Sequence, residues 1–160
     1  MSLISEHPSK SHENKYKRVQ IISLKMVKEG SLKYLAEKIP GSSAAAEIAK
    51  KFLADADREH FIAMYLDTRN TITAIHTISI GTVDSSLIHP REVFKGALLS
   101  NASALIIAHN HPSGNVVPSE KDIKVTKILK KAGEILGIKL LDHIIVGEKN
   151  HMSFSSEGLI

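Results

Sequence analysis

Apolar and polar residues follow one another along this chain with two different periods. Short apolar runs that end at turn-forming residues predict β-strands. The strands are expected at residues 19–27, 61–66, 71–80, 104–108 and 138–146, with a short edge strand at 152–154. Apolar residues spaced three to four apart predict helices at residues 42–55, after His89-Pro90, and from Ser119 to a stop at Gly137.

The order of these elements predicts the fold class. Residues 67–70 (DTRN) are expected to form a turn that joins two strands into a hairpin, and the full order is β-α-β-β-α-β-α-β. Such a chain can bury a mixed central sheet between helices on both faces, which is a three-layer α-β-α domain of the α/β class. The polar residues 1–16 are expected to be disordered, which leaves one domain over residues 17–160.

The amino-acid composition narrows the chemistry that this domain can perform. Its 160 residues are 42% hydrophobic and 24% charged, as in ordinary globular proteins. The chain has no run of about 18 apolar residues and no signal-peptide core, so a cytoplasmic location is expected. Zero cysteines exclude disulfides, thiolate zinc sites and a cysteine nucleophile. Any metal must therefore be bound by histidine and carboxylate side chains.

The chain is mildly basic, with a formal net charge of +4 and a pI near 9.2. Most of the local excess lies on one expected helix, at Lys121, Lys124, Lys127, Lys130 and Lys131. We expect these lysines to form a solvated outer face, because an aromatic content of 4% offers few side chains for stacking on bases. The charge permits contact with nucleic acid but does not indicate it.

The candidate chemistry is concentrated in one short segment, His109-Asn-His111 followed by Ser119-x-x-Asp122. Two imidazoles two residues apart lie on the same side of an extended segment, so both can reach one metal ion. Asp122, at the start of the next expected helix, can supply a third ligand. Two histidines and one carboxylate, with a fourth position left open, are typical of a catalytic zinc.

A zinc enzyme that hydrolyses amide bonds also requires a base and a donor to the oxyanion. Glu59, shortly before an expected strand, is the candidate base, with Glu92 as the alternative. Ser119 is the candidate oxyanion donor, although Ser119-x-x-Asp122 is also a capping-box variant that can simply begin a helix. His143 lies inside an expected strand, where a role in the core or at the surface is the simpler interpretation.

The spacing His109-x-His111-x7-Ser119-x2-Asp122 resembles the JAMM motif of JAB/MPN-domain metalloproteases, and the string HNHPSGNVVPSEKD resembles their bacterial RadC branch, the UPF0758 family. The likeness covers roughly residues 19–154, with supporting segments at residues 58–61, 66–70, 79–82, 89–94 and 141–143. It implies a cytidine-deaminase-like α-β-α fold and a Zn2+ ion held by His109, His111 and Asp122. It also implies that Glu59 acts as general acid/base and that Ser119 stabilises the tetrahedral intermediate.

The resemblance leaves the substrate open. JAMM proteins outside this branch cleave isopeptide bonds to ubiquitin-like tails, so the expected partner is a peptide or protein substrate. A DNA-repair-associated nucleic-acid-binding module and a zinc-bound scaffold without turnover are the alternatives. The letters His-Asn-His are not the nuclease motif of that name, which requires a ββα hairpin around its metal, whereas here they end an apolar strand and enter a proline-rich loop.

Overall fold

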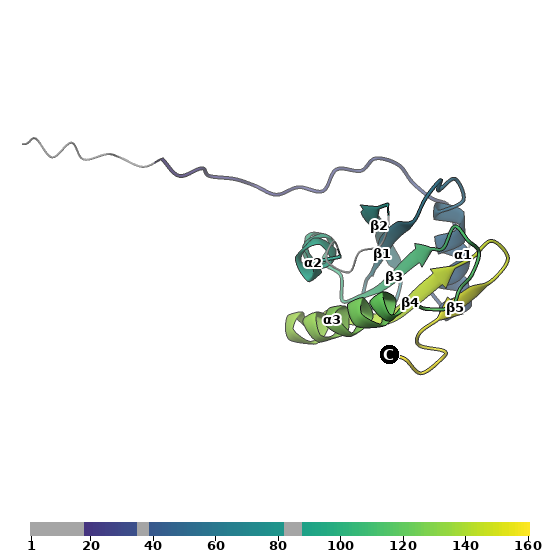
Figure 1. Cartoon of the computed structure of the whole chain (residues 1–160). Coiled ribbons are helices and arrows are strands. Elements are labelled where there is room, and N and C mark those ends of the chain that lie inside the picture. Colours follow the sequence, from purple (N-terminus) through teal and green to yellow (C-terminus); the bar gives the residue numbers. More distant parts are fainter. Residues whose placement is uncertain (1–17, 35–38, 82–87) are drawn as a thin grey trace, which may run out of the picture.

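The computed structural model describes residues 18–34, 39–81 and 88–160, and the expected disordered tail at residues 1–16 lies outside these ranges. The described elements follow one another as α-β-β-α-β-α-β-β (Figure 1). They are α1 (Ser42–Phe52), β1 (His60–Leu66), β2 (Ile72–Ile80), α2 (Pro90–Leu99), β3 (Ala104–Asn110), α3 (Glu120–Leu136), β4 (Lys139–Val146) and β5 (His151–Ser153).

The five strands form one mixed sheet in the order β2-β1-β3-β4-β5. Strand β1 pairs antiparallel with both β2 and β3, and the expected β1–β2 hairpin is confirmed. Strands β3 and β4 run parallel, because α3 carries the chain back across the sheet between them. Short β5 closes the far edge antiparallel to β4. The strand with the candidate ligands, β3, is therefore central and is hydrogen-bonded on both sides.

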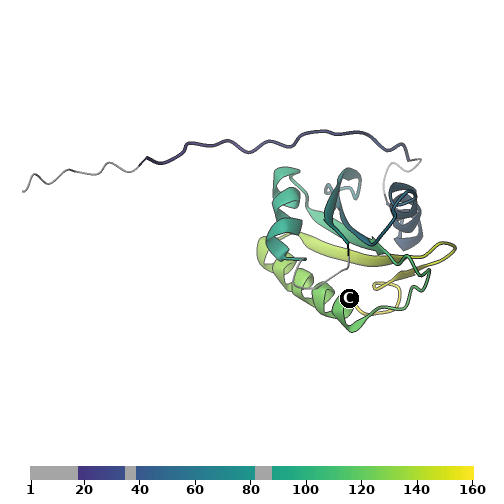
Figure 2. The ribbon, with the colours of Figure 1, turned by 45° about the horizontal axis from the view of Figure 1, so that its top comes forward.

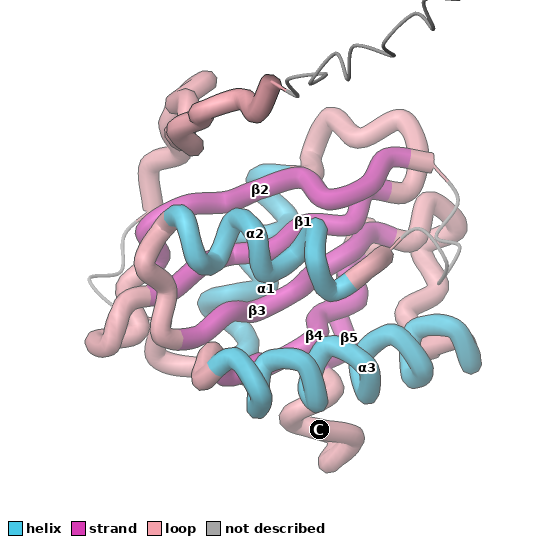
Figure 3. The backbone as a smooth tube through the Cα atoms, turned by 90° about the vertical axis from the view of Figure 1, so that its left-hand side faces the viewer, coloured by secondary structure: helices cyan, strands magenta, loops and turns pink. Residues whose placement is uncertain are grey.

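Helices cover both faces of this sheet, as Figure 3 shows: α2 and α3 lie on one face and α1 on the other. Alternation along β1 produces the two layers of core. Phe61 and Tyr65 pack with residues of α2 and α3, whereas Ile62 and Met64 pack with α1. The predicted three-layer α-β-α class is confirmed. None of the helices within the described ranges is long and apolar enough to cross a membrane.

The predicted strand at residues 19–27 is wrong. This segment has no regular structure, and Figures 1 and 2 show it leading away from the domain. Its apolar side chains are exposed, with Val19 at 88% and Ile21 at 101% of their free area. Strand-forming side chains do not suffice to make a strand, because a strand also needs a neighbour for its backbone hydrogen bonds. The first element of the described fold is consequently α1.

Helix α3 begins and ends where its sequence predicts, with Ser119 as N-cap and Gly137 in the left-handed conformation (φ 69°) as C-cap. Its buried face is narrower than the apolar pattern suggests. Ile135 is 86% exposed, and Ile128 and Leu136 are also exposed. The buried stripe instead consists of Asp122, Val125, Thr126, Leu129 and Gly133. Two polar residues of α3 thus face the sheet, close to the end of β3.

Candidate metal centre

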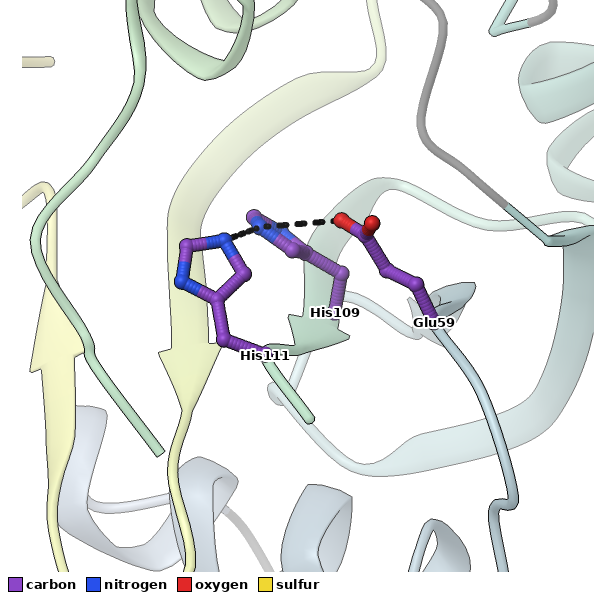
Figure 4. A group of neighbouring side chains, drawn as sticks. All are labelled: Glu59, His109 and His111. Atoms are coloured by element: carbon purple, nitrogen blue, oxygen red, sulfur yellow. Dashed lines mark hydrogen bonds and ion pairs between the residues drawn. The ribbon is translucent and has the colours of Figure 1, made fainter. Parts of the chain in front are cut away.

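Strand β3 places both motif histidines on the same side of the sheet. His109 is the next-to-last residue of β3 and is completely buried. The backbone N–H of His111 donates to the carbonyl of Val146 at 3.0 Å, so the ladder with β4 continues one residue past the strand. Because the extended backbone persists, the two imidazoles point the same way, with their Nε2 atoms 2.9 Å apart (Figure 4).

Asp122 approaches the same point from the first turn of α3. Its Oδ1 lies 3.4 Å from Nε2 of His109, and its Oδ2 lies 3.9 Å from Nε2 of His111. A capping box holds it there: the backbone N–H and the hydroxyl of Ser119 both donate to Oδ2 at 2.7 Å, and the N–H of Asp122 donates to the Ser119 hydroxyl at 3.2 Å. The helix start therefore orients the carboxylate, leaving Oδ1 directed at His109.

Glu59 enters the site from the segment before β1. Its Oε1 lies 3.9 Å from Nε2 of His109, and ligand atoms of Glu59, His109 and His111 all lie within 4.8 Å of one another. Figure 4 shows these three side chains pointing toward one another. The alternative base, Glu92, lies on α2, where its carboxylate pairs with Lys95 at 2.6 Å. Of the two candidate bases, Glu59 is the one that the fold brings to the histidines.

Asn110, between the two histidines, holds the Glu59 segment in place. Its side-chain amide donates to the carbonyl of Arg58 at 2.8 Å, and its side-chain carbonyl accepts from the N–H of His60 at 2.7 Å. These two hydrogen bonds fix the backbone at the residues on either side of Glu59. Sequence reasoning misses this role, because the partners lie about 50 residues apart and nothing local to the motif indicates the pairing.

The donor set fits a metal ion. Two ligands of a tetrahedral zinc, each about 2.0–2.1 Å from the ion, lie roughly 3.3 Å apart. The separations found from His109 Nε2 to His111 Nε2 (2.9 Å) and to Asp122 Oδ1 (3.4 Å) bracket that value. The Nδ1–H of His111 donates to the carbonyl of Asn115 at 2.5 Å, so its Nε2 lone pair faces the site.

The electrostatics of the site also favour a bound cation. Burial is the main reason that the pKa of His109 is lowered to about 4. The negative charge of Asp122 raises this pKa and the neighbouring His111 lowers it, but burial has the largest effect. The imidazole of His109 is therefore neutral at pH 7. A neutral imidazole presents a lone pair to the two nearby carboxylates. Nitrogen lone pairs and carboxylate oxygens that converge in this way form a set of ligands that suits zinc and other divalent transition-metal ions.

Both carboxylates stand close enough to be the third ligand. Asp122 is only 2% exposed and lies nearer to His109 Nε2, whereas the Glu59 side chain is 21% exposed and lies 3.9 Å from the same atom. The geometry is thus consistent with Asp122 as ligand and Glu59 as a second carboxylate beside it. The fold brings together five of the residues singled out in the sequence, namely Glu59, His109, His111, Ser119 and Asp122.

A third histidine, His143 on β4, lies directly behind His109. It is completely buried, and its Nε2 is 2.9 Å from Nδ1 of His109. Its other nitrogen contacts the hydroxyl of Thr126 on α3 at 2.6 Å. Its position in the core agrees with the simpler interpretation, but its contact with a candidate ligand does not follow from the sequence. Adjacent parallel strands β3 and β4 create that contact across 34 residues.

Comparison with known proteins shows the family. The model for the RadC-like JAB domain matches residues 39–159. A UPF0758 protein of Desulforamulus reducens is 55% identical over 108 residues, which are 68% of this chain and 48% of that protein. A UPF0758 protein of Chlorobaculum tepidum is 47% identical over 123 residues, 77% of this chain and 55% of that protein. The chain spans about half the length of the curated relatives it matches. This chain therefore belongs to the RadC-like JAB domain family.

Proposed function

We propose that this chain is a zinc-dependent metallopeptidase that hydrolyses peptide or isopeptide bonds, with His109, His111 and Asp122 as metal ligands. The observation that carries the proposal is the convergence of the two Nε2 atoms and the Asp122 carboxylate within 2.9–3.9 Å, with a second carboxylate beside them. A catalytic zinc typically has three protein ligands and one water, whereas a structural zinc has four protein ligands, and His109, His111 and Asp122 would supply three. The second carboxylate, Glu59, is the group that hydrolysis requires.

Zinc, when bound, supplies a Lewis acid that lowers the pKa of a coordinated water to about 7. The Glu59 carboxylate then serves as the base that takes a proton from the attacking water and delivers it to the leaving amine. Its position suits this role, because the side chain just before β1 is partly exposed and its Oε1 lies 3.9 Å from Nε2 of His109. Asn110 keeps the backbone of Glu59 from moving during that transfer.

Ser119 is proposed to stabilise the oxyanion of the tetrahedral intermediate. In the resting arrangement its hydroxyl donates to Oδ2 of Asp122. To donate to substrate, the hydroxyl must rotate away from that carboxylate, which keeps the backbone N–H of Ser119 as a partner at 2.7 Å. The serine can therefore serve both as helix cap and as donor, and its removal should reduce turnover more than metal binding.

The proposed substrate is a peptide or protein, including the extended tail of a ubiquitin-like protein. A proteome-derived peptide library, incubated with the zinc-loaded chain, samples many cleavage sequences at once. Wild type should produce new termini that Glu59→Gln fails to produce, with a loss of about 10²–10⁴-fold expected for removal of a general base. The matched control is Glu92→Gln, which removes a carboxylate paired with Lys95 away from the histidines.

Two outcomes would replace this proposal. Tight zinc binding with equal library profiles for wild type and Glu59→Gln would indicate a metal-bound scaffold. Absence of zinc binding under metal-replete conditions would contradict the proposal of a metallopeptidase. The nucleic-acid-binding alternative would then be tested by substituting Lys124 and Lys127, which are both exposed on the outer side of α3.

A further inference from the structure

A chain of buried hydrogen bonds joins one candidate ligand to another behind the metal centre. It runs from the ring of His109 to that of His143 at 2.9 Å, and from His143 to the hydroxyl of Thr126 at 2.6 Å. The Thr126 hydroxyl also donates to the backbone carbonyl of Asp122 at 2.6 Å. His109 and His143 have no exposed surface, and Thr126 is 1% exposed. Water therefore has no access to any link of this chain.

Counting protons assigns a direction to every link. A carbonyl can only accept, so the single proton of the Thr126 hydroxyl goes to Asp122, and the hydroxyl oxygen must accept from His143. Nδ1 of His143 consequently carries a proton, and its Nε2 is left with a lone pair. That lone pair can only accept, so Nδ1 of His109 is the donor. The remaining nitrogen of His109, Nε2, then presents its lone pair to the candidate metal position.

The ring of His143 is held against rotation. The ring of Phe154 stacks on it, with the centroids 4.6 Å apart and an interplanar angle of 19°, and the ring of Phe61 lies at a steep angle of 60° with its centroid 5.6 Å away. The backbone N–H of His143 donates to the Asp142 carboxylate at 2.8 Å, and its carbonyl accepts from Phe154 at 2.9 Å. A ring flip would exchange the two nitrogens and reverse the proton order, and the packing opposes it.

We propose that His143 and Thr126 are positioning residues for the metal centre, which fix His109 as the tautomer whose Nε2 faces the ion. The inference rests on the proposed metal site but not on peptide hydrolysis. Histidine ligands in metal sites commonly donate their second N–H to an acceptor that sets tautomer and ring orientation. Here the acceptor is a neutral imidazole, and its own tautomer is set by the helix that carries the third ligand. The position of α3 and the orientation of His109 are thereby coupled.

The shape-conserving substitution Thr126→Val tests this role. It removes the hydroxyl and allows His143 to carry its proton on Nε2, which would turn the Nε2 of His109 into an N–H. The dissociation constant for zinc, measured by competition with a chromophoric chelator, should rise about 10- to 100-fold. Thr126→Ser retains the hydroxyl and should bind zinc within about threefold of wild type, well below the roughly 10- to 100-fold weakening typical of losing an outer partner.

A variant that disturbs the packing of α3 next to Thr126, without removing a hydrogen bond, provides the control. Val125→Ala shortens a neighbouring buried side chain of α3 that packs in the hydrophobic core and has no group that could hydrogen-bond to His143. It should lower the melting temperature while leaving the zinc dissociation constant close to that of wild type. If Thr126→Val binds zinc as wild type does, or if Val125→Ala weakens binding as much as Thr126→Val, the positioning role is wrong.

Nitrogen NMR of the histidine rings tests the proton order directly and without any turnover. Long-range 1H–15N correlation spectra of the zinc-loaded and the metal-free protein at neutral pH should show His143 protonated on Nδ1 in both. In Thr126→Val, a signal from the Nε2–H tautomer should appear. A wild-type His143 protonated on Nε2 would overturn the inference even if the chain proves to be a peptidase, whereas loss of peptidase activity alone would leave it standing.

Discussion

Lowering the pH from 7.5 to 4 should destabilise the metal-free chain through its buried histidines. The pKa of His109 is about 4 in the folded chain, chiefly because burial disfavours the charged ring, against about 6.5 in an unfolded chain. Burial also lowers the pKa of His143 well below its usual value. As the pH falls between these values, the histidine rings of the unfolded chain bind protons, whereas the buried rings of the folded chain stay neutral. The stabilisation is thus complete above pH 6.5 and is lost as the pH falls toward 4.

The size of the effect follows from the same values. The difference between a pKa of 6.5 and one of about 4 corresponds to roughly 3 kcal/mol for His109 alone. His143 adds to this in the same direction. Surface carboxyls with a lowered pKa, such as Asp67 with its hydrogen bond from the backbone of Thr71, reach their titration only near the bottom of the window. The histidines therefore dominate the upper part of the curve.

Urea unfolding at a series of pH values, with a chelator present, measures this dependence. Wild type should lose unfolding free energy steadily from pH 6.5 to 4, with a slope approaching about 1.4 kcal/mol per pH unit for each buried histidine. His109→Gln should reduce the slope, even though the variant is less stable at every pH. His151→Gln removes a histidine outside the buried group and serves as the control. A wild-type curve that is flat across this window would refute the reasoning.

Three further results are expected. Measured by chelator competition, Asp122→Asn should raise the zinc dissociation constant more than about 100-fold, and Glu59→Gln should raise it less than about tenfold. If Glu59→Gln weakens zinc binding more than Asp122→Asn does, Glu59 is the ligand and Asp122 is not. In Asn110→Ala the backbone around Glu59 loses both of its hydrogen bonds to the Asn110 side chain. The free energy of unfolding, measured by urea titration, should fall by about 1–3 kcal/mol, and the rate of peptide cleavage should fall about 10²-fold. An unchanged rate of cleavage would contradict the role of Asn110. Neutralising Lys124 and Lys127 should leave gel-shift behaviour on DNA unchanged at low salt, and a salt-sensitive loss would instead support nucleic-acid binding.

The parts of the site that lie close together in the chain can be predicted from its sequence. His109 and His111 are separated by one residue of an extended strand, and Ser119 and Asp122 belong to one helix start, so local geometry alone places each pair. The loop between the pairs is short enough to bring them together. The capping box is predictable for the same reason, because all its atoms come from four consecutive residues.

The parts that depend on contacts between distant strands cannot be predicted in this way. Asn110 grips a segment about 50 residues away, and His143 reaches His109 only because β3 and β4 are parallel neighbours. The strand expected at residues 19–27 is wrong for a related reason, since strand propensity says nothing about the presence of a pairing partner. Ile135 continues the apolar pattern of α3, yet Gly133 is the last buried residue of that helix.

A zinc-loaded crystal, with diffraction recorded on both sides of the zinc absorption edge, tests the central claim most directly. The account predicts one anomalous peak within bonding distance, about 2.0–2.2 Å, of Nε2 of His109, Nε2 of His111 and a carboxylate oxygen of Asp122, with Glu59 outside that distance. A peak elsewhere in the molecule, or no peak in crystals that contain excess zinc, would contradict it.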